Sequence, residues 1–407
     1  MSEWRRLTVN DLAADKGIVG GPFGSSLGGK DYVDSGTPVI RGQNLGSDGK
    51  FKAEGFVFVT QEKTDKDLTR NIALPGDVVF TQRGTLGQVG IVPEEPFDRY
   101  VISQSQMRLR VNTKLTTSEF IYYYFRSPKM VRKIHNRAIS TGVPHINLGI
   151  LKSFEIDLPH LSEQRAITTV LGALDDKIAV NERISSTAIA LADTLFASEA
   201  TDLEFGEETF DSVARVAGGG TPKTSEEEYW GGDIAWTTPK DVTALRSPYL
   251  FNTARSITQF GLDNCASELY PAQSIFMTSR ATIGAFSIPQ IPAAVNQGFI
   301  VVIPITDNLR WWLFHEMRSR VDEMLSLANG STFLELSRKN FKAMPVRIPE
   351  PDVLQRFHSR VNLLHENARN AASESRTLAA LRDTLLPQLM SGKLRVKDAE
   401  KIVEDNV

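Results

Sequence analysis

The chain has 407 residues, of which 41% are hydrophobic and 23% charged, and its formal net charge is −3. Such proportions are typical of a water-soluble globular protein with two or three domains. No apolar run approaches the roughly 20 residues that a membrane span needs, and the N-terminus lacks the apolar segment of a secretory signal. The single cysteine, Cys265, excludes an internal disulfide and a metal site built from several thiolates. We therefore expect a cytoplasmic protein.

Residues 1–158 are predicted to form a first globular domain of mixed strands and short helices, because short apolar runs alternate with turn signals. Its clearest helical segment covers residues 120–137, with Pro128 as an expected break. The aromatic residues 122–125 crowd one short stretch, which favours core packing over base stacking. Residues 126–137 contain five Lys or Arg and no acidic residue, which fits either a DNA-binding surface or a solvated helix face.

A long helix is predicted over residues 159–202, which contain almost no Gly or Pro. Apolar and small residues recur there at alternating spacings of three and four over about four heptads, as in a coiled-coil seam. Gly172 is expected to weaken this helix.

Residues 203–348 are predicted to form a second domain that repeats the first. The segment GDVVFTQRGTLGQVGIV (76–92) returns as AQSIFMTSRATIGAFSI (272–288), and residues 140–159 match residues 330–349 at an offset of 190. Both copies of the first segment predict a strand, a Thr-x-Arg-[Gly/Ala]-Thr turn and a second strand. The order of elements is therefore duplicated.

Residues 349–396 repeat the long helix, and residues 397–407 follow as an acidic tail. Pro387 is expected to kink or end this second helix. We predict that the two helices form an antiparallel coiled coil, so the fold class is α+β, with two α/β domains each followed by a long helix. The alternative is two amphipathic helices packed on separate domains. The predicted seam comprises Ile167, Leu171, Leu174, Ile178, Phe357, Val361, Leu364, Leu378 and Leu385.

Signatures of catalysis are weak or absent in the sequence. Residues 24–31 approximate a phosphate-binding loop, but Asp31 occupies the position of the Ser or Thr that would bind magnesium. The same loop matches G-x-S-x-G without the strand and helix that a nucleophile elbow needs. The chain contains no Pro-Pro pair, which excludes the loop that holds the target amine in amino-methyltransferases, and it contains no H-E-x-x-H. We therefore expect a protein without catalytic activity or metal of its own.

The repeated Thr-x-Arg turns provide candidate contacts to nucleic acid. An arginine fork suits a phosphate or a guanine edge equally well, and the alternative is a hairpin turn whose Arg pairs with a nearby acid. Other polar residues on presumed loops and the basic run are weaker candidates. The candidate DNA-binding residues are Arg41, Gln43, Thr81, Arg83, Thr85, Gln104, Lys129, Arg132, Lys133, Thr237, Thr238, Lys240, Thr278, Arg280, Thr282 and Gln297.

The whole repeated plan resembles the specificity subunit of type I restriction-modification systems. Each stretch that carries the resemblance is weak alone, but their order along the chain is specific. These stretches are residues 20–45, 76–92, 156–178, 217–242, 272–288 and 381–396.

The resemblance implies that each domain is a target recognition domain that reads one half of a split, asymmetric DNA sequence. It also implies partners for the chain. Two methyltransferase subunits would dock on the helices and methylate adenine with S-adenosylmethionine, and restriction subunits with ATP and Mg²⁺ are possible further partners. The chain itself would then hold no cofactor and bind double-stranded DNA. The alternative function is a two-headed coiled-coil scaffold that binds protein or sugar.

Overall fold

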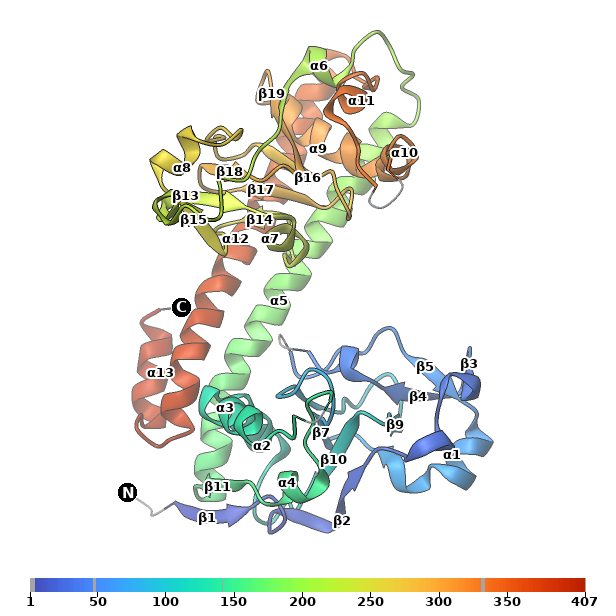
Figure 1. The fold of residues 1–407 in the computed structure, drawn as a ribbon, viewed down its shortest axis with the longest axis vertical. Helices are drawn as coiled ribbons and strands as arrows, with labels where there is room; N and C mark the ends of the chain where they lie inside the picture. The colour runs from blue at the N-terminus through green and yellow to red at the C-terminus, as the bar shows by residue number, and fades with distance from the viewer. Residues whose placement is uncertain (1–3, 47–48, 141, 331–333, 407) are drawn as a thin grey trace. The chain divides into compact units, whose positions relative to one another are not determined.

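The computed structural model describes residues 4–46, 49–140, 142–330 and 334–406 and divides into two compact units (Figure 1). The first unit combines residues 1–179 with residues 377–407, and the second comprises residues 180–376. The fold is mixed α and β, with two repeated domains each followed by a long helix, α5 (Leu161–Ala200) and α12 (Pro351–Leu389). The predicted fold class is thereby confirmed. In the described ranges, no helix has both the length and the apolar content that crossing a membrane requires.

Where the structure describes it, the first unit has three small sheets. An antiparallel sheet has the strand order β2-β10-β7-β8, a second has the order β3-β5-β4-β9-β6 with β4 and β9 parallel, and β1 pairs with β11. The strands are β1 (Arg5–Thr8), β2 (Ala13–Gly20), β3 (Tyr32–Val33), β4 (Thr37–Ile40), β5 (Val57–Val59), β6 (Ile72–Ala73), β7 (Val78–Thr81), β8 (Val89–Ile91), β9 (Tyr100–Ile102), β10 (Gln106–Val111) and β11 (Glu155–Leu158). The helices of this domain are α1 (Gln61–Asp67), α2 (Ser118–Arg126), α3 (Pro128–Asn136) and α4 (Leu148–Lys152).

Helix α2 supplies much of the core of this unit. All six residues 120–125 are buried, which confirms core packing for the aromatic residues among them. The helix ends where expected, because Ser127 has an extended backbone and precedes Pro128. The hydroxyl oxygen of Ser127 then accepts a hydrogen bond from the N–H of Met130, so it caps α3, which starts with Pro128.

The second unit repeats this plan. Strand order β12-β19-β16-β17 corresponds to β2-β10-β7-β8, and the parallel pair β13–β18 corresponds to β4–β9. The strands are β12 (Ala214–Ala217), β13 (Trp230–Thr237), β14 (Tyr249–Leu250), β15 (Arg255–Ile257), β16 (Ile275–Thr278), β17 (Phe286–Pro289), β18 (Ala293–Val295) and β19 (Phe299–Pro304). The helices are α6 (Phe210–Val213), α7 (Pro239–Thr243), α8 (Gln259–Asp263), α9 (Leu309–Ser319), α10 (Val321–Ser326) and α11 (Arg338–Lys342).

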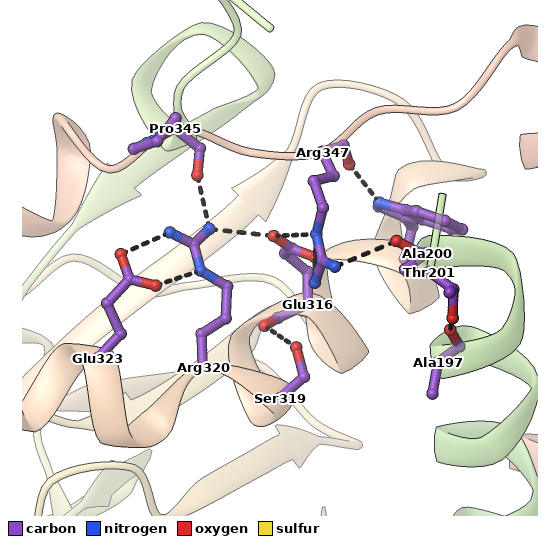
Figure 2. A network of polar contacts seen from close by, with 10 residues as sticks. Ala197, Ala200, Thr201, Glu316, Ser319, Arg320, Glu323, Pro345 and Arg347 are labelled. Atoms are coloured by element: carbon purple, nitrogen blue, oxygen red, sulfur yellow. Dashed lines mark hydrogen bonds and ion pairs between the residues drawn. The ribbon is translucent and has the colours of Figure 1, made fainter. Parts of the chain in front are cut away.

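A buried ionic network fixes α9 in the second unit (Figure 2). The carboxylate of Glu316, which is 0% exposed, accepts hydrogen bonds from the guanidinium groups of Arg320 (3.0 Å) and Arg347 (2.8 Å). Arg320 also pairs with Glu323, and Arg347 also donates to the carbonyl oxygen of Ala200 in α5. Two cations on one buried carboxylate connect α9, α5 and the irregular segment around residue 347.

Within each unit the long helices run antiparallel. In the first unit Asp175 accepts a hydrogen bond from Arg382 (2.7 Å), and in the second Asn181 donates to Glu374 (2.8 Å) and Phe196 packs on Phe357. Later residues of α5 thus meet earlier residues of α12. Each predicted seam residue belongs to the hydrophobic core of its own unit. The core of the first unit includes Ile167, Leu171, Leu174, Ile178, Leu378 and Leu385, and the core of the second includes Phe357, Val361 and the partly buried Leu364.

The C-terminal part of the chain differs in detail from the expectation. Helix α12 continues for two residues beyond Pro387 before it ends. The residues expected as a tail include a helix, α13 (Val396–Glu404), whose Ala399 is buried in the first core. Partly buried Ile402 and Val403 pack on the same core, so apolar spacing within the acidic segment explains this helix.

Candidate nucleic-acid interface

Loops of the first domain are joined by backbone hydrogen bonds where β2, β4, β7 and β9 end. The N–H of Gln82, just after β7, donates to the carbonyl of Ser105 (2.7 Å). The N–H of Ser103, just after β9, donates to the carbonyl of Ile40 at the end of β4 (3.0 Å). The N–H of Ile146 donates to Gln82 (3.0 Å) and brings in a further loop. We call this surface loop cluster 1; it comprises residues 20–28, 41–44, 82–88, 103–105 and 142–147.

The second domain has the same connections at equivalent positions. The N–H of Ser279 donates to Gly298 (2.8 Å), and the N–H of Asn296 donates to Thr237 (3.0 Å). The N–H of Leu336 donates to Ser279 (2.9 Å). The duplicated sequence therefore builds the same surface twice. We call the second surface loop cluster 2; it comprises residues 218–224, 238–241, 279–285, 296–298 and 334–337.

A glycine and a glutamine hold the first loop of each cluster. A Cβ on Gly21 would collide with the carbonyl oxygen of Ser103, and a Cβ on Gly219 would collide with that of Val295, so only glycine fits. The predicted contact residue Gln104 donates its amide N–H groups to the carbonyls of Gly24 (2.7 Å) and Leu27.

The matching glutamine of the second cluster acts through its other amide atom. The oxygen of Gln297 accepts a hydrogen bond from the Thr221 hydroxyl (2.6 Å). Both glutamines are exposed, and both also position the loop beside them.

Three predicted threonines lie beneath the surface rather than on it. Thr81 and Thr278 are the last residues of β7 and β16, and both are buried, as is Thr237 at the end of β13. The hydroxyl of Thr81 donates to the Gln88 side chain (3.0 Å), and that of Thr278 donates to the carbonyl of Thr282 (2.5 Å). Thr81 and Thr278 thus stabilise the turns above them, whereas the buried hydroxyl of Thr237 has no hydrogen-bond partner among the described residues.

A matched pair of turns places two long polar side chains on the surface. The N–H of Arg41 donates to Asn44 Oδ1 (2.9 Å), and the N–H of Thr238 donates to Asp241 Oδ2 (2.8 Å).

Gln43 and Lys240 lie two residues into these turns, and both are exposed. Arg41 is partly buried and donates to the carbonyl of Gly55 (2.9 Å), and Thr238 is also partly buried. The exposed side chain of this turn therefore ends in an amide in cluster 1 (Gln43) and in a cation in cluster 2 (Lys240).

The repeated arginines are both exposed but have different neighbours. Arg83 forms an isolated β-bridge with His145, and in the described part of the chain its guanidinium has no acidic partner. Arg280 forms the equivalent bridge with Glu335, and its guanidinium pairs with that carboxylate at 2.8 Å. The predicted alternative of a locally paired arginine thus holds for Arg280. Thr85 and Thr282, two residues further on, are exposed beside these arginines.

The basic helix α3 lies beside loop cluster 1 but directs its lysines elsewhere. Val131 and His135 face the turn at Gly87. Lys129 and Lys133 lie on the other side, where Lys129 is 3.7 Å from Asp157 and Lys133 lies over the ring of Phe154. Of the predicted basic residues, the structure therefore does not bring these two lysines into the cluster; the third, Arg132, is exposed on the same helix.

The glycine-rich loop continues past cluster 1 to Asp31, whose carboxylate stays ionised. The pKa of Asp31 is lowered, first because its carboxylate accepts a hydrogen bond from the N–H of Gly28 (2.8 Å), and further because Lys63 lies 3.2 Å away. A fixed negative charge there is unfavourable for binding phosphate. Among the residues that the structure describes, no three His, Cys, Asp or Glu side chains gather in a way that could hold a metal ion.

Sequence reasoning missed two residues of these surfaces. Phe23 projects from the first loop of cluster 1 and is 84% exposed. Glu335 neutralises Arg280 in cluster 2. The repeat contained a signal for Glu335, since His145 lies 190 residues earlier and Glu335 is its counterpart. No spacing pattern pointed to Phe23.

Comparison with known proteins identifies relatives for both domains. The family described as "Type I restriction modification DNA specificity domain" matches residues 20–188 and again residues 204–359. The type I restriction enzyme HindI specificity subunit of Haemophilus influenzae is 20% identical over 399 residues, which cover 78% of this chain and 86% of that protein.

A second relative is more similar over a shorter region. The type I restriction enzyme MjaIX specificity subunit of Methanocaldococcus jannaschii is 32% identical over 168 residues, which are 41% of this chain but only 39% of that protein. In fold, the chain is similar to the crystal structure of the type I restriction-modification system S subunit from M. genitalium. That similarity has a TM-score of 0.57 at 17% identity and covers 95% of this chain and 96% of the other.

Proposed function

Since the chain belongs to the type I restriction-modification DNA specificity family, we propose that it binds DNA sequence-specifically and that each domain reads one half of a split, asymmetric target. The observation that supports this most is the duplicated loop cluster. The same backbone connections recur in both domains, while the exposed side chains on them differ. Two readers with one framework and different surfaces suit two unlike half-sites.

The exposed residues of each cluster fit the chemistry of DNA recognition. Phosphate contacts supply affinity and position, and contacts to base edges supply specificity. Arg83 and Arg280 can bind a phosphate or the O6 and N7 atoms of guanine through a planar fork. Gln43 suits an adenine edge, and Lys240 suits a guanine edge or a phosphate.

We further propose that the long helices dock the methyltransferase subunits. Val180, Ile184 and Leu191 of α5 are exposed apolar residues, and their spacings of four and seven place them on one face of the helix. In this proposal the partner subunits methylate adenine with S-adenosylmethionine, restriction subunits with ATP and Mg²⁺ can join them, and the chain itself performs no chemistry and holds no cofactor.

Exchange of one domain tests whether each domain recognises one half of the target. Residues 1–150 are replaced by the matching domain of a relative, and methylated adenines are mapped in DNA from cells that carry the chimaera with its methyltransferase partners. We expect one half of the target to change and the other to persist. A change in both halves, or in neither, would contradict separate readers.

Two measurements on the purified chain test the remaining parts of the proposal. Binding to target DNA should weaken steeply with salt, because each neutralised phosphate releases counterions, whereas a sugar-binding scaffold should hardly respond. Incubation with labelled S-adenosylmethionine and DNA should transfer no label unless a methyltransferase subunit is added. Transfer by the chain alone would show that it is an enzyme.

A further inference from the structure

Phe23 is the most exposed of the large apolar side chains in the described part of the chain, at 84%. Single apolar residues on a surface are common and usually need no explanation. Phe23 differs from such residues in its location and in the ordered backbone on both sides of it. It lies in loop cluster 1, next to the residues proposed to contact DNA.

The backbone on both sides of Phe23 is held in place. On one side, Pro22 is buried and Gly21 packs tightly on the carbonyl of Ser103. On the other, Gln104 donates hydrogen bonds to the carbonyls of Gly24 and Leu27. A phenyl ring on such a loop loses little conformational freedom when it binds, because its backbone is already ordered.

Backbone connections put Phe23 on the same loop cluster as the polar contact candidates. The N–H of Gly21 donates to Gln106 (2.8 Å), which is the strand partner of Thr81 in β7, two residues before Arg83. The loop that carries the exposed Val143 also belongs to this cluster, so the same surface offers apolar groups and the exposed Arg83. Cluster 2 has no such ring, since the aligned residue is Thr221, whose hydroxyl is bound by Gln297.

We propose that Phe23 is a specificity-determining residue that makes an apolar contact with a base in the half-site read by the first domain. The chemistry it recognises is the apolar surface of a base, either the 5-methyl group of thymine or the face of a partly unstacked base. This inference rests on the proposed function. It adds an apolar contact to the hydrogen bonds and charge contacts proposed for the polar residues of the same surface.

The test uses the full chain assembled with its methyltransferase subunits, on target DNA identified by methylation mapping. Phe23→Ala should weaken binding to the target by roughly tenfold, the scale of one aromatic contact to a base, and should leave binding to unrelated DNA unchanged. Phe23→Leu should recover part of the loss. Ile305→Ala serves as the control, because Ile305 is 64% exposed but follows the end of β19 remote from loop cluster 2.

Modified DNA separates the two sources of the contact. If a thymine methyl is read, uracil at one position of the first half-site should weaken binding by the wild type but not further weaken binding by Phe23→Ala. If a base is unstacked, 2-aminopurine in that half-site should brighten with the wild type and not with Phe23→Ala.

Two results would overturn the inference. One is target binding by Phe23→Ala that equals the wild type, and the other is an equal loss on target and unrelated DNA. Failure of the proposed function gives a different result, in which the wild type itself does not distinguish its target from unrelated DNA.

Discussion

The two loop clusters share their backbone and differ in what they expose. Hydrogen bonds between equivalent loops recur at nearly the same distances in both domains. The surface side chains diverge, with Phe23 replaced by Thr221 and Gln43 replaced by Lys240. The contrast shows that the duplicated part of the sequence specifies the framework, while single exposed positions can change without disturbing it.

The side chains that connect each domain to the long helices also differ between the two units. In the first unit the Tyr123 hydroxyl donates to Asp175 of α5 (2.6 Å), which also binds Arg382. The residue 190 positions after Asp175 is His365 of α12, and its Nε2 lies 3.0 Å from the Nε2 of His315. The carboxylate of Asp193 in α5 also binds His315 and Arg318, so both units use a carboxylate of α5 and the second adds a pair of buried imidazoles.

The largest expected effect is a loss of stability in the second unit when Glu316 is replaced. Glu316→Gln leaves the buried guanidinium groups of Arg320 and Arg347 without a full counter-charge, so we expect a loss of about 3–5 kcal/mol in the stability of the second unit. The equivalent position in the first unit is Arg126, so that unit has no equivalent of this carboxylate. Hydrogen exchange of α9 and α2 under denaturant reports the units separately. The control Glu323→Gln, at a carboxylate 43% exposed, should cost far less; equal losses would show that burial of Glu316 is unimportant.

The second prediction concerns pH and the buried histidines. Burial lowers the pKa of His315, and it lowers the pKa of His365 well below the ordinary value of 6.5. Because unfolding raises both values, the unfolded chain binds more protons below about pH 6.5. The stabilising effect is therefore complete above that pH and declines as the pH falls towards the folded pKa values, by about 1.4 kcal/mol for each unit of pKa shift.

Unit-resolved hydrogen exchange between pH 8 and pH 5 checks this. The second unit should lose protection below pH 6.5, and His365→Gln should flatten that dependence. An unchanged pH dependence in His365→Gln would assign the effect to other groups.

The sequence repeat predicted the duplicated domains, the long helices and the arginine turns, because strand–turn–strand and heptad patterns are local. The repeat did not predict which residues of the turns are exposed and which are buried beneath them. Thr81 and Thr278 belong to the same turns as Arg83 and Arg280, yet they end buried strands whose partners lie far along the chain. The bond from Ser103 to Ile40, for example, joins residues 63 apart, and only the structure shows such long-range pairing.

The third prediction tests Arg83, which has no acidic partner among the residues that the structure describes. Arg83→Ala should weaken target binding by about 1–3 kcal/mol and relax specificity at one base pair if the guanidinium binds guanine. If it binds a phosphate, all sequences should weaken equally and the slope of log K against log salt should fall by about 0.9. Binding across a set of single-base variants at several salt concentrations distinguishes the two. If Arg83→Ala alters neither the affinity nor the salt slope, Arg83 does not belong to the interface.

The smallest effect is expected from Glu335, and it addresses the charge difference between the clusters directly. Arg280 and Glu335 are each about half exposed, at 44% and 45%, and an ion pair this accessible is typically worth less than about 1 kcal/mol. DNA can therefore displace the carboxylate at small cost, but the carboxylate still repels nearby phosphates. Glu335→Gln should tighten binding less than about fivefold, a shift that corresponds to about 1 kcal/mol, and should make the salt dependence steeper. His145→Glu, which places the same carboxylate beside Arg83, should do the reverse in cluster 1. If Glu335 instead accepts a hydrogen bond from a cytosine amine, Glu335→Gln should weaken binding to the target alone. The carboxylate would then contact a base rather than weaken the binding of Arg280 to DNA.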